Sequence, residues 1–138
     1  MNVHIHLQIA GGLLLLLSAA HAGFSRYFGW KQELRQLSLL TRQIFLAHSF
    51  FIALVVALMG SLSLFCTSAL LAPGPLSRAV LAGIFVFWLC RLAFQWFVYD
   101  AAIWRGKRLY TFMHFAFSVF WIYTVLTYGL ALRSVWAS

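Results

Sequence analysis

The sequence predicts an all-α integral membrane protein, built as an up-down bundle of four transmembrane helices. Hydrophobic residues make up 64% of the 138 residues and charged residues only 9%, whereas about 25% charged residues is usual in soluble domains. The apolar residues are gathered in four runs, each as long as the roughly 20 residues that cross a bilayer. These runs use most of the chain, so we expect one membrane domain over residues 1–138.

Each predicted span is an apolar run bounded by polar or helix-breaking residues. The spans cover about residues 5–28, 43–71, 78–102 and 109–132. Pro73-Gly74-Pro75 closes the second span, because this triplet cannot continue a helix. Residues 30–42 are polar with leucines at helical spacing, which predicts either a separate interfacial helix or an extension of the second span.

The basic residues lie at the ends of the apolar runs, where they act as topology signals. The formal net charge of +8 does not predict nucleic-acid binding, since that needs basic residues gathered on one exposed face. The first and third loops and their flanks carry Arg26, Lys31, Arg35, Arg42, Arg105, Lys107 and Arg108, and the opposite side carries Arg78 and Arg133. By the positive-inside rule, we expect both termini on the non-cytoplasmic side of a bacterial inner membrane.

Two histidines are predicted to lie at the same depth in the membrane. His48 comes six residues after Arg42, and His114 comes six residues after Arg108. The second and fourth spans run in the same direction, so both imidazoles should lie about 9 Å inside the basic end. Polar side chains inside spans usually face the bundle interior, which makes both histidines candidates for a site.

Other polar residues are predicted near the same layer. Counting along the first and third spans adds His21 and Gln95, with Arg91 one turn from Gln95 on the same face. The two acids, Glu33 and Asp100, belong to the same side of the membrane. We expect Arg91 to pair with Asp100 or a carbonyl group, or to extend toward the surface. We expect His4 and His6 to be interfacial residues without partners.

The imidazoles of His48 and His114 are at the same depth, on helices that lie diagonally opposite in the predicted bundle. This arrangement predicts one cofactor between them, with haem b favoured. His48 and His114 would be its axial ligands, and Arg42, Arg108 and Arg26 would lie near its propionates. Aromatic residues, Tyr110 and Trp121 among them, would wall the macrocycle. In architecture this arrangement resembles the small b-type cytochrome membrane anchors, over the two histidine-bearing helices and their basic ends. The resemblance implies an electron-transfer subunit.

Two other functions use the same features. His21, His48 and His114 supply three nitrogen ligands, with Glu33 as a fourth ligand or general base, which would suit zinc, copper or non-haem iron in a membrane enzyme. Alternatively, the chain is an accessory subunit that positions lipids or partner subunits and carries out no reaction. In each case we expect the lipid bilayer and either other membrane subunits or further copies of the chain as partners.

Overall fold

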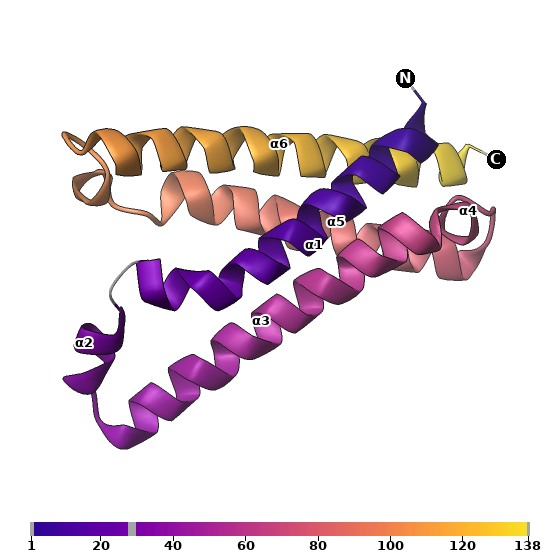
Figure 1. Cartoon of the computed structure of the whole chain (residues 1–138). Coiled ribbons are helices and arrows are strands. Elements are labelled where there is room, and N and C mark those ends of the chain that lie inside the picture. The colour runs from indigo at the N-terminus through magenta and orange to yellow at the C-terminus, as the bar shows by residue number, and fades with distance from the viewer. Residues whose placement is uncertain (1, 28–29, 138) are drawn as a thin grey trace. The chain divides into compact units, whose positions relative to one another are not determined.

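The computed structural model describes residues 2–27 and 30–137, without the side chains of residues 22, 24–27, 30, 31 and 33. These residues form helices and no strand (Figure 1). The helices are α1 (Val3–Tyr27), α2 (Trp30–Arg35), α3 (Leu39–Phe65), α4 (Thr67–Leu70), α5 (Pro75–Phe97), the 3-10 helix η1 (Ala101–Ile103) and α6 (Arg108–Trp136). Four of them, α1, α3, α5 and α6, are long and apolar enough to cross a membrane, which confirms the predicted all-helical class.

The polar segment 30–42 is divided between two helices. The short helix α2 ends at Arg35, and α3 begins at Leu39, four residues before the predicted start of the second span. Ser38 sets this start, because its Oγ accepts a hydrogen bond from the backbone N–H of Thr41 at 3.2 Å and so caps the helix. At its other end α3 stops at Phe65, and α4 follows as a separate short helix.

The third apolar run begins earlier and ends earlier than predicted. Pro75 stands at the first turn of α5, where its fixed φ suits a helix and its missing N–H leaves no bond unmade. After Phe97 the chain leaves the helix and forms η1, which Asp100 caps by accepting from the backbone N–H of Ala102 at 2.8 Å. Gly106 then reverses the chain with a φ of 76°, a conformation that glycine adopts without steric cost.

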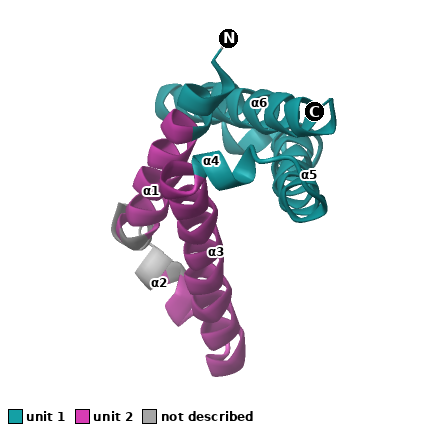
Figure 2. Ribbon diagram, turned by 90° about the vertical axis from the view of Figure 1, so that its right-hand side faces the viewer, with its two compact units in different colours: residues 1–7, 67–138 teal, residues 8–66 magenta. Residues whose placement is uncertain are grey.

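Two compact units make up the chain, and each is described by itself (Figure 2). Unit 1 comprises Met1–Leu7 with Thr67–Ser138, and unit 2 comprises Gln8–Cys66. Unit 1 therefore contains α4, α5, η1 and α6 with the first residues of α1. Unit 2 contains the rest of α1 with α2 and α3.

In unit 2, α1 and α3 approach closely at two glycines. A Cβ on Gly11 would lie 2.7 Å from the backbone nitrogen of Leu64 and 2.8 Å from the carbonyl oxygen of Gly60. Ser18 adds a polar contact, since its Oγ donates to the carbonyl oxygen of Ala53 at 2.7 Å. Small residues such as Gly11, Ala53 and Gly60 allow this backbone approach between apolar helices.

In unit 1, α5 and α6 pack side by side in opposite directions (Figure 1). Near the start of α5, Nε of Arg78 donates to the carbonyl oxygen of Val135 at 3.2 Å, close to the end of α6. Further along, the ring of Phe85 packs against Gly129, where a Cβ would lie 3.1 Å from the ring. The remaining end of the pair, next to η1, holds a polar cluster.

Candidate functional site

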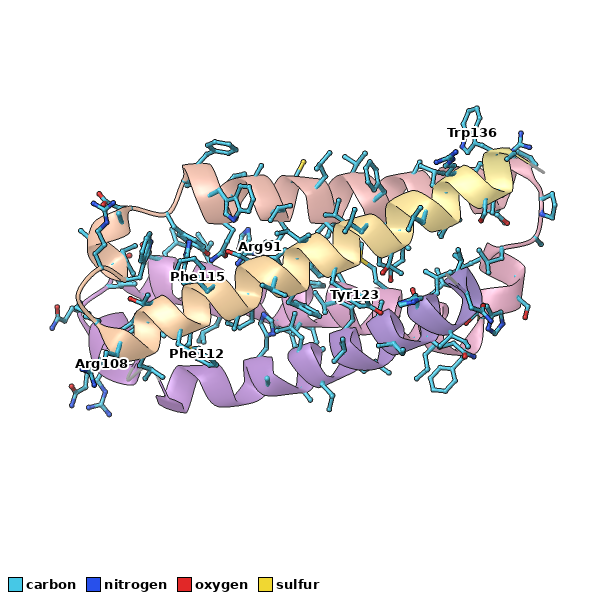
Figure 3. All side chains as sticks on the ribbon, turned by 90° about the horizontal axis from the view of Figure 1, so that it is seen from above. Arg91, Arg108, Phe112, Phe115, Tyr123 and Trp136 are labelled. Carbon is cyan, nitrogen blue, oxygen red and sulfur yellow. The ribbon has the colours of Figure 1, made fainter. Side chains whose placement is uncertain are left out.

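Five side chains from α5 and α6 form a polar and aromatic cluster in unit 1. Nη1 of Arg91 donates to Oε1 of Gln95 at 3.2 Å, and Nε2 of Gln95 lies 3.0 Å from Nδ1 of His114. Figure 3 shows the Arg91 side chain between the two helices. We refer to Trp88, Arg91, Gln95, His114 and Trp121 as the Arg91 cluster.

Aromatic rings surround the guanidinium of Arg91. Its Cζ lies 4.8 Å from the ring centroid of Trp121 and 5.5 Å from that of Tyr99, which are cation–π distances. Trp88 stacks on Trp121 with centroids 5.1 Å apart and planes 15° apart, and Phe117 stacks on Trp121 at 5.8 Å. Trp88, Arg91 and Gln95 share one face of α5 because of their helical spacing. Tyr99 contacts Arg91 from the segment that follows the end of α5 at Phe97.

The hydrogen bonds assign the protonation of His114. Because Arg91 can only donate, Oε1 of Gln95 faces Arg91 and the Nε2 amide group faces His114. Nδ1 of His114 therefore accepts, and the proton of the neutral ring is on Nε2. Trp104 holds this ring in place, stacking on it with centroids 4.5 Å apart and planes 12° apart.

In the described part of unit 1, three indole N–H groups are buried without a hydrogen-bond partner. They belong to Trp88, Trp104 and Trp121. Trp88 is 1% exposed and Trp121 is 3% exposed, so water does not reach them freely. A buried N–H without an acceptor is unusual in a native structure and calls for an explanation.

Among the described residues, no carboxylate contacts Arg91. The carboxylate of Asp100 accepts instead from the backbone N–H of Ala102 in η1. The expected pairing of Arg91 with Asp100 is therefore wrong. The bond goes to the amide oxygen of Gln95, which carries no charge. The Glu33 side chain lies outside the described residues. Within the described part of the chain, the partners of the Arg91 charge are therefore ring faces and one amide dipole.

His48 and His21 lie in unit 2, whereas His114 lies in unit 1. Nδ1 of His48 bonds to the carbonyl oxygen of Ile44 at 2.9 Å, and Nδ1 of His21 bonds to that of Leu17 at 2.8 Å. Within either unit, the described residues hold no group of three His, Cys, Asp or Glu side chains that could bind a metal ion. The predicted haem site between His48 and His114 is not tested by the structure. The same holds for the metal site of His21, His48 and His114, and both remain predictions.

The remaining predicted site residues lie at helix ends. Arg42 is half-buried in the first turn of α3, and Arg108 is exposed at the start of α6 (Figure 3). Tyr110 is exposed too, with Nζ of Lys107 5.5 Å from its ring centroid. The side chains of Arg26 and Lys31 lie outside the described residues.

The expectation that His4 and His6 have no partners is wrong. Nδ1 of His6 lies 3.2 Å from the hydroxyl of Tyr123, which in turn donates to the carbonyl oxygen of His6 at 3.4 Å. Nε2 of His4 lies 3.4 Å from Oγ of Ser68. Tyr123 projects from the middle of α6, and a count of depth from the basic ends alone does not find this pair.

The stacking of Trp104 on His114 was also not expected, because the sequence places Trp104 in a polar turn. The turn folds back on α6, where Oγ1 of Thr111 donates to the carbonyl oxygen of Trp104 at 2.6 Å. The tryptophan ring thereby covers the imidazole. Comparisons with protein-family models, with curated proteins and with solved structures find no match to this chain.

Proposed function

We propose that this protein is an integral membrane protein, an up-down bundle of four helices, and that it works as a non-catalytic accessory subunit. The four long apolar helices support membrane insertion. Large hydrophobic side chains are exposed along them, for example Leu58, Phe50 and Phe115. In water such exposure would lead to aggregation, whereas in a bilayer lipid or a partner protein covers it.

The observation that carries the accessory role is the bonding of His114. A haem or metal ligand must offer an imidazole lone pair. The lone pair on Nδ1 of His114 accepts from Gln95, and Nε2 carries the proton. The polar groups of α5 and α6 are thus used to join the two helices, as in Trp96, whose Nε1 donates to Oγ of Ser118 at 3.2 Å.

A redox subunit is the second candidate, because His48 has the bonding of a typical metal ligand. Metal-bound histidines usually donate one ring N–H to a carbonyl and bind the metal through the other nitrogen, and Nδ1 of His48 bonds to the carbonyl of Ile44. His48 and His114 would then be the axial ligands of haem b, with Arg42 and Arg108 near the propionates. In the alternative metal site, His21, His48 and His114 would bind zinc, copper or non-haem iron.

For the accessory role we propose other membrane subunits or further copies of this chain as partners. We also propose the bacterial inner membrane as the location, with both termini on the non-cytoplasmic side. This orientation is supported by the basic residues of the connection before α6, Arg105, Lys107 and Arg108, since basic residues are enriched in cytoplasmic loops.

Spectroscopy of the purified protein separates the two candidates. The full chain would be produced with excess haem, purified in mild detergent and examined by optical absorption and elemental analysis. The accessory role predicts no Soret band, no bound metal, and co-purification with a defined complex of larger mass. A Soret band that is lost in His48→Ala would overturn it, and so would a stable lone monomer.

A further inference from the structure

We propose that the Arg91 cluster binds the acidic headgroup of a membrane amphiphile, meaning a carboxylate or phosphate that is attached to an apolar tail. Nothing in the accessory role requires this site, so the proposal goes beyond it. Three properties of the cluster carry the proposal: its hydrogen-bond donors outnumber its acceptors, its charge has no counter-ion among the described residues, and it lies close to a basic helix end.

The excess of donors indicates what kind of ligand the cluster can take. A guanidinium has five N–H groups, and Arg91 uses Nη1 on Gln95. The indole N–H groups of Trp88 and Trp121 have no acceptor, and Nε2 of His114 carries a proton. The acceptors, in contrast, are already engaged, since Oε1 of Gln95 accepts from Arg91 and Nδ1 of His114 accepts from Gln95. The cluster thus has free donors and lacks free acceptors. An oxyanion, which supplies hydrogen-bond acceptors only, would meet this need.

The charge of Arg91 points to an anion and not to a neutral acceptor. Of the two acids in the chain, Asp100 caps η1, and the side chain of Glu33 lies outside the described residues. No carboxylate in the described part of the chain compensates the guanidinium. A lone charge within an apolar helix is costly. A carboxylate or phosphate would neutralise it and could accept two parallel N–H bonds from the planar guanidinium.

The position of the cluster suits the head of an amphiphile. Arg91 lies six residues before the end of α5 at Phe97, about 9 Å along the helix, which is within reach of the membrane surface. At that end the exposed Arg105, Lys107 and Arg108 attract anions. Apolar side chains next to the cluster, Phe94 and Phe115, are 57% and 60% exposed, so an apolar tail could lie against them. The ring centroid of Phe115 lies 5.9 Å from that of His114 in the cluster.

The test is a titration of the full chain in phosphatidylcholine nanodiscs, followed by NMR of 15N-labelled indoles. Three probes are added separately: dioleoyl phosphatidic acid, oleate and inorganic phosphate. We expect phosphatidic acid or oleate to shift the indole resonances of Trp88 and Trp121 in a saturable manner. Inorganic phosphate at the same concentration should leave both resonances unchanged, because it has no tail.

Matched variants assign the effect to the cluster. Arg91→Gln should weaken binding by about tenfold or more, as expected when a charge-assisted hydrogen bond is lost. The control Arg133→Gln removes an equal charge from an exposed position of α6 and should change binding by less than about twofold. Where Arg91→Gln does not fold, Trp88→Phe and Trp121→Phe keep the aromatic rings and remove the donors, and each should weaken binding severalfold.

Three results would overturn the proposal. The first is that neither amphiphile shifts the two indole resonances. The second is that the Arg91→Gln or tryptophan variants bind as well as the unaltered chain. The third is saturation by inorganic phosphate alone, which would indicate an anion site without selectivity for an amphiphile. The result of this titration does not depend on the optical spectrum or on co-purification, which test the accessory role. The amphiphile site and the accessory role can therefore be disproved separately.

Discussion

The side-chain amide of Gln95 joins α5 to α6 by donating to His114 at 3.0 Å while its oxygen accepts from Arg91 at 3.2 Å. Gln95 is only 4% exposed, so its amide has no free access to solvent and depends on these two partners. Any shift of α6 along α5 would separate the amide from the imidazole. Gln95 therefore contributes to the alignment of the two helices, beside the bonds from Arg78 to Val135 and from Trp96 to Ser118, and also orients the guanidinium.

Replacing Gln95 should destabilise unit 1. Gln95→Leu loses both bonds but keeps a side chain of similar volume, so we expect a loss of about 1 kcal/mol, the usual size of a polar contact between membrane helices. The measurement is the unfolding midpoint in a titration of mild detergent with sodium dodecyl sulfate. Gln43→Leu is the control, because Gln43 is an exposed residue of α3. Equal midpoints for both variants would contradict the role of Gln95.

The contact between α1 and α3 should tolerate no side chain at Gly11. A Cβ there would lie 2.7 Å from the backbone nitrogen of Leu64, and a backbone atom cannot move aside as a side chain can. Gly11→Ala should therefore cost about 1–3 kcal/mol of stability. Gly12→Ala is a matched control, since a Cβ there meets nothing within 4 Å and alanine favours the helix. The same unfolding titration should rank Gly12→Ala at or above the unaltered chain.

The sequence was sufficient to predict the four apolar helices, because the length of a hydrophobic run depends on the order of residues along the chain and not on tertiary contacts. Helix ends were harder to predict. The cap at Ser38 and the proline at Pro75 are local signals that extend α3 and α5 beyond their apolar runs. The break after Phe65 has no such signal, since Cys66 and its neighbours are compatible with a helix.

For the site, counting residues put Gln95 and His114 at one level and Arg91 on the same face as Gln95. Such a count could not determine with which partner each side chain forms its hydrogen bond. Helical periodicity specifies a face and a depth, whereas the bond from Arg91 to Gln95, and not to Asp100, depends on rotamers and on the capping of η1. The ring of Trp104 on His114 depends on a turn whose path the sequence does not specify.

The first residues of α1 should be held by Tyr123. Its hydroxyl bonds to both the ring and the backbone of His6, all within unit 1. Tyr123→Phe removes these bonds and keeps the ring, so we expect faster amide hydrogen exchange over residues 3–7. The control Tyr99→Phe removes a hydroxyl from an exposed tyrosine and should leave exchange at these residues unchanged. Identical exchange in the two variants would show that the pair does not hold the segment.

The proposed orientation can be tested by fusing reporters to the C-terminus. With both termini on the non-cytoplasmic side, alkaline phosphatase fused after residue 138 should be active, since it folds only in an oxidising compartment. Green fluorescent protein at the same position should be dark. A cysteine placed at the exposed Arg105, in a variant that lacks Cys66 and Cys90, should be labelled by an impermeant maleimide only after the cells are opened.

The same fusions also test which charges determine the orientation. The connection before α6 carries Arg105, Lys107 and Arg108, whereas Arg78 is the basic residue near the preceding turn. Exchanging the three basic residues for glutamine removes a large part of the charge difference between the two sides, so reporter activity should become mixed. Arg78→Gln increases the difference and should leave the phosphatase fully active. A phosphatase fusion that is inactive in the unaltered chain, with a bright fluorescent fusion, would reverse the orientation.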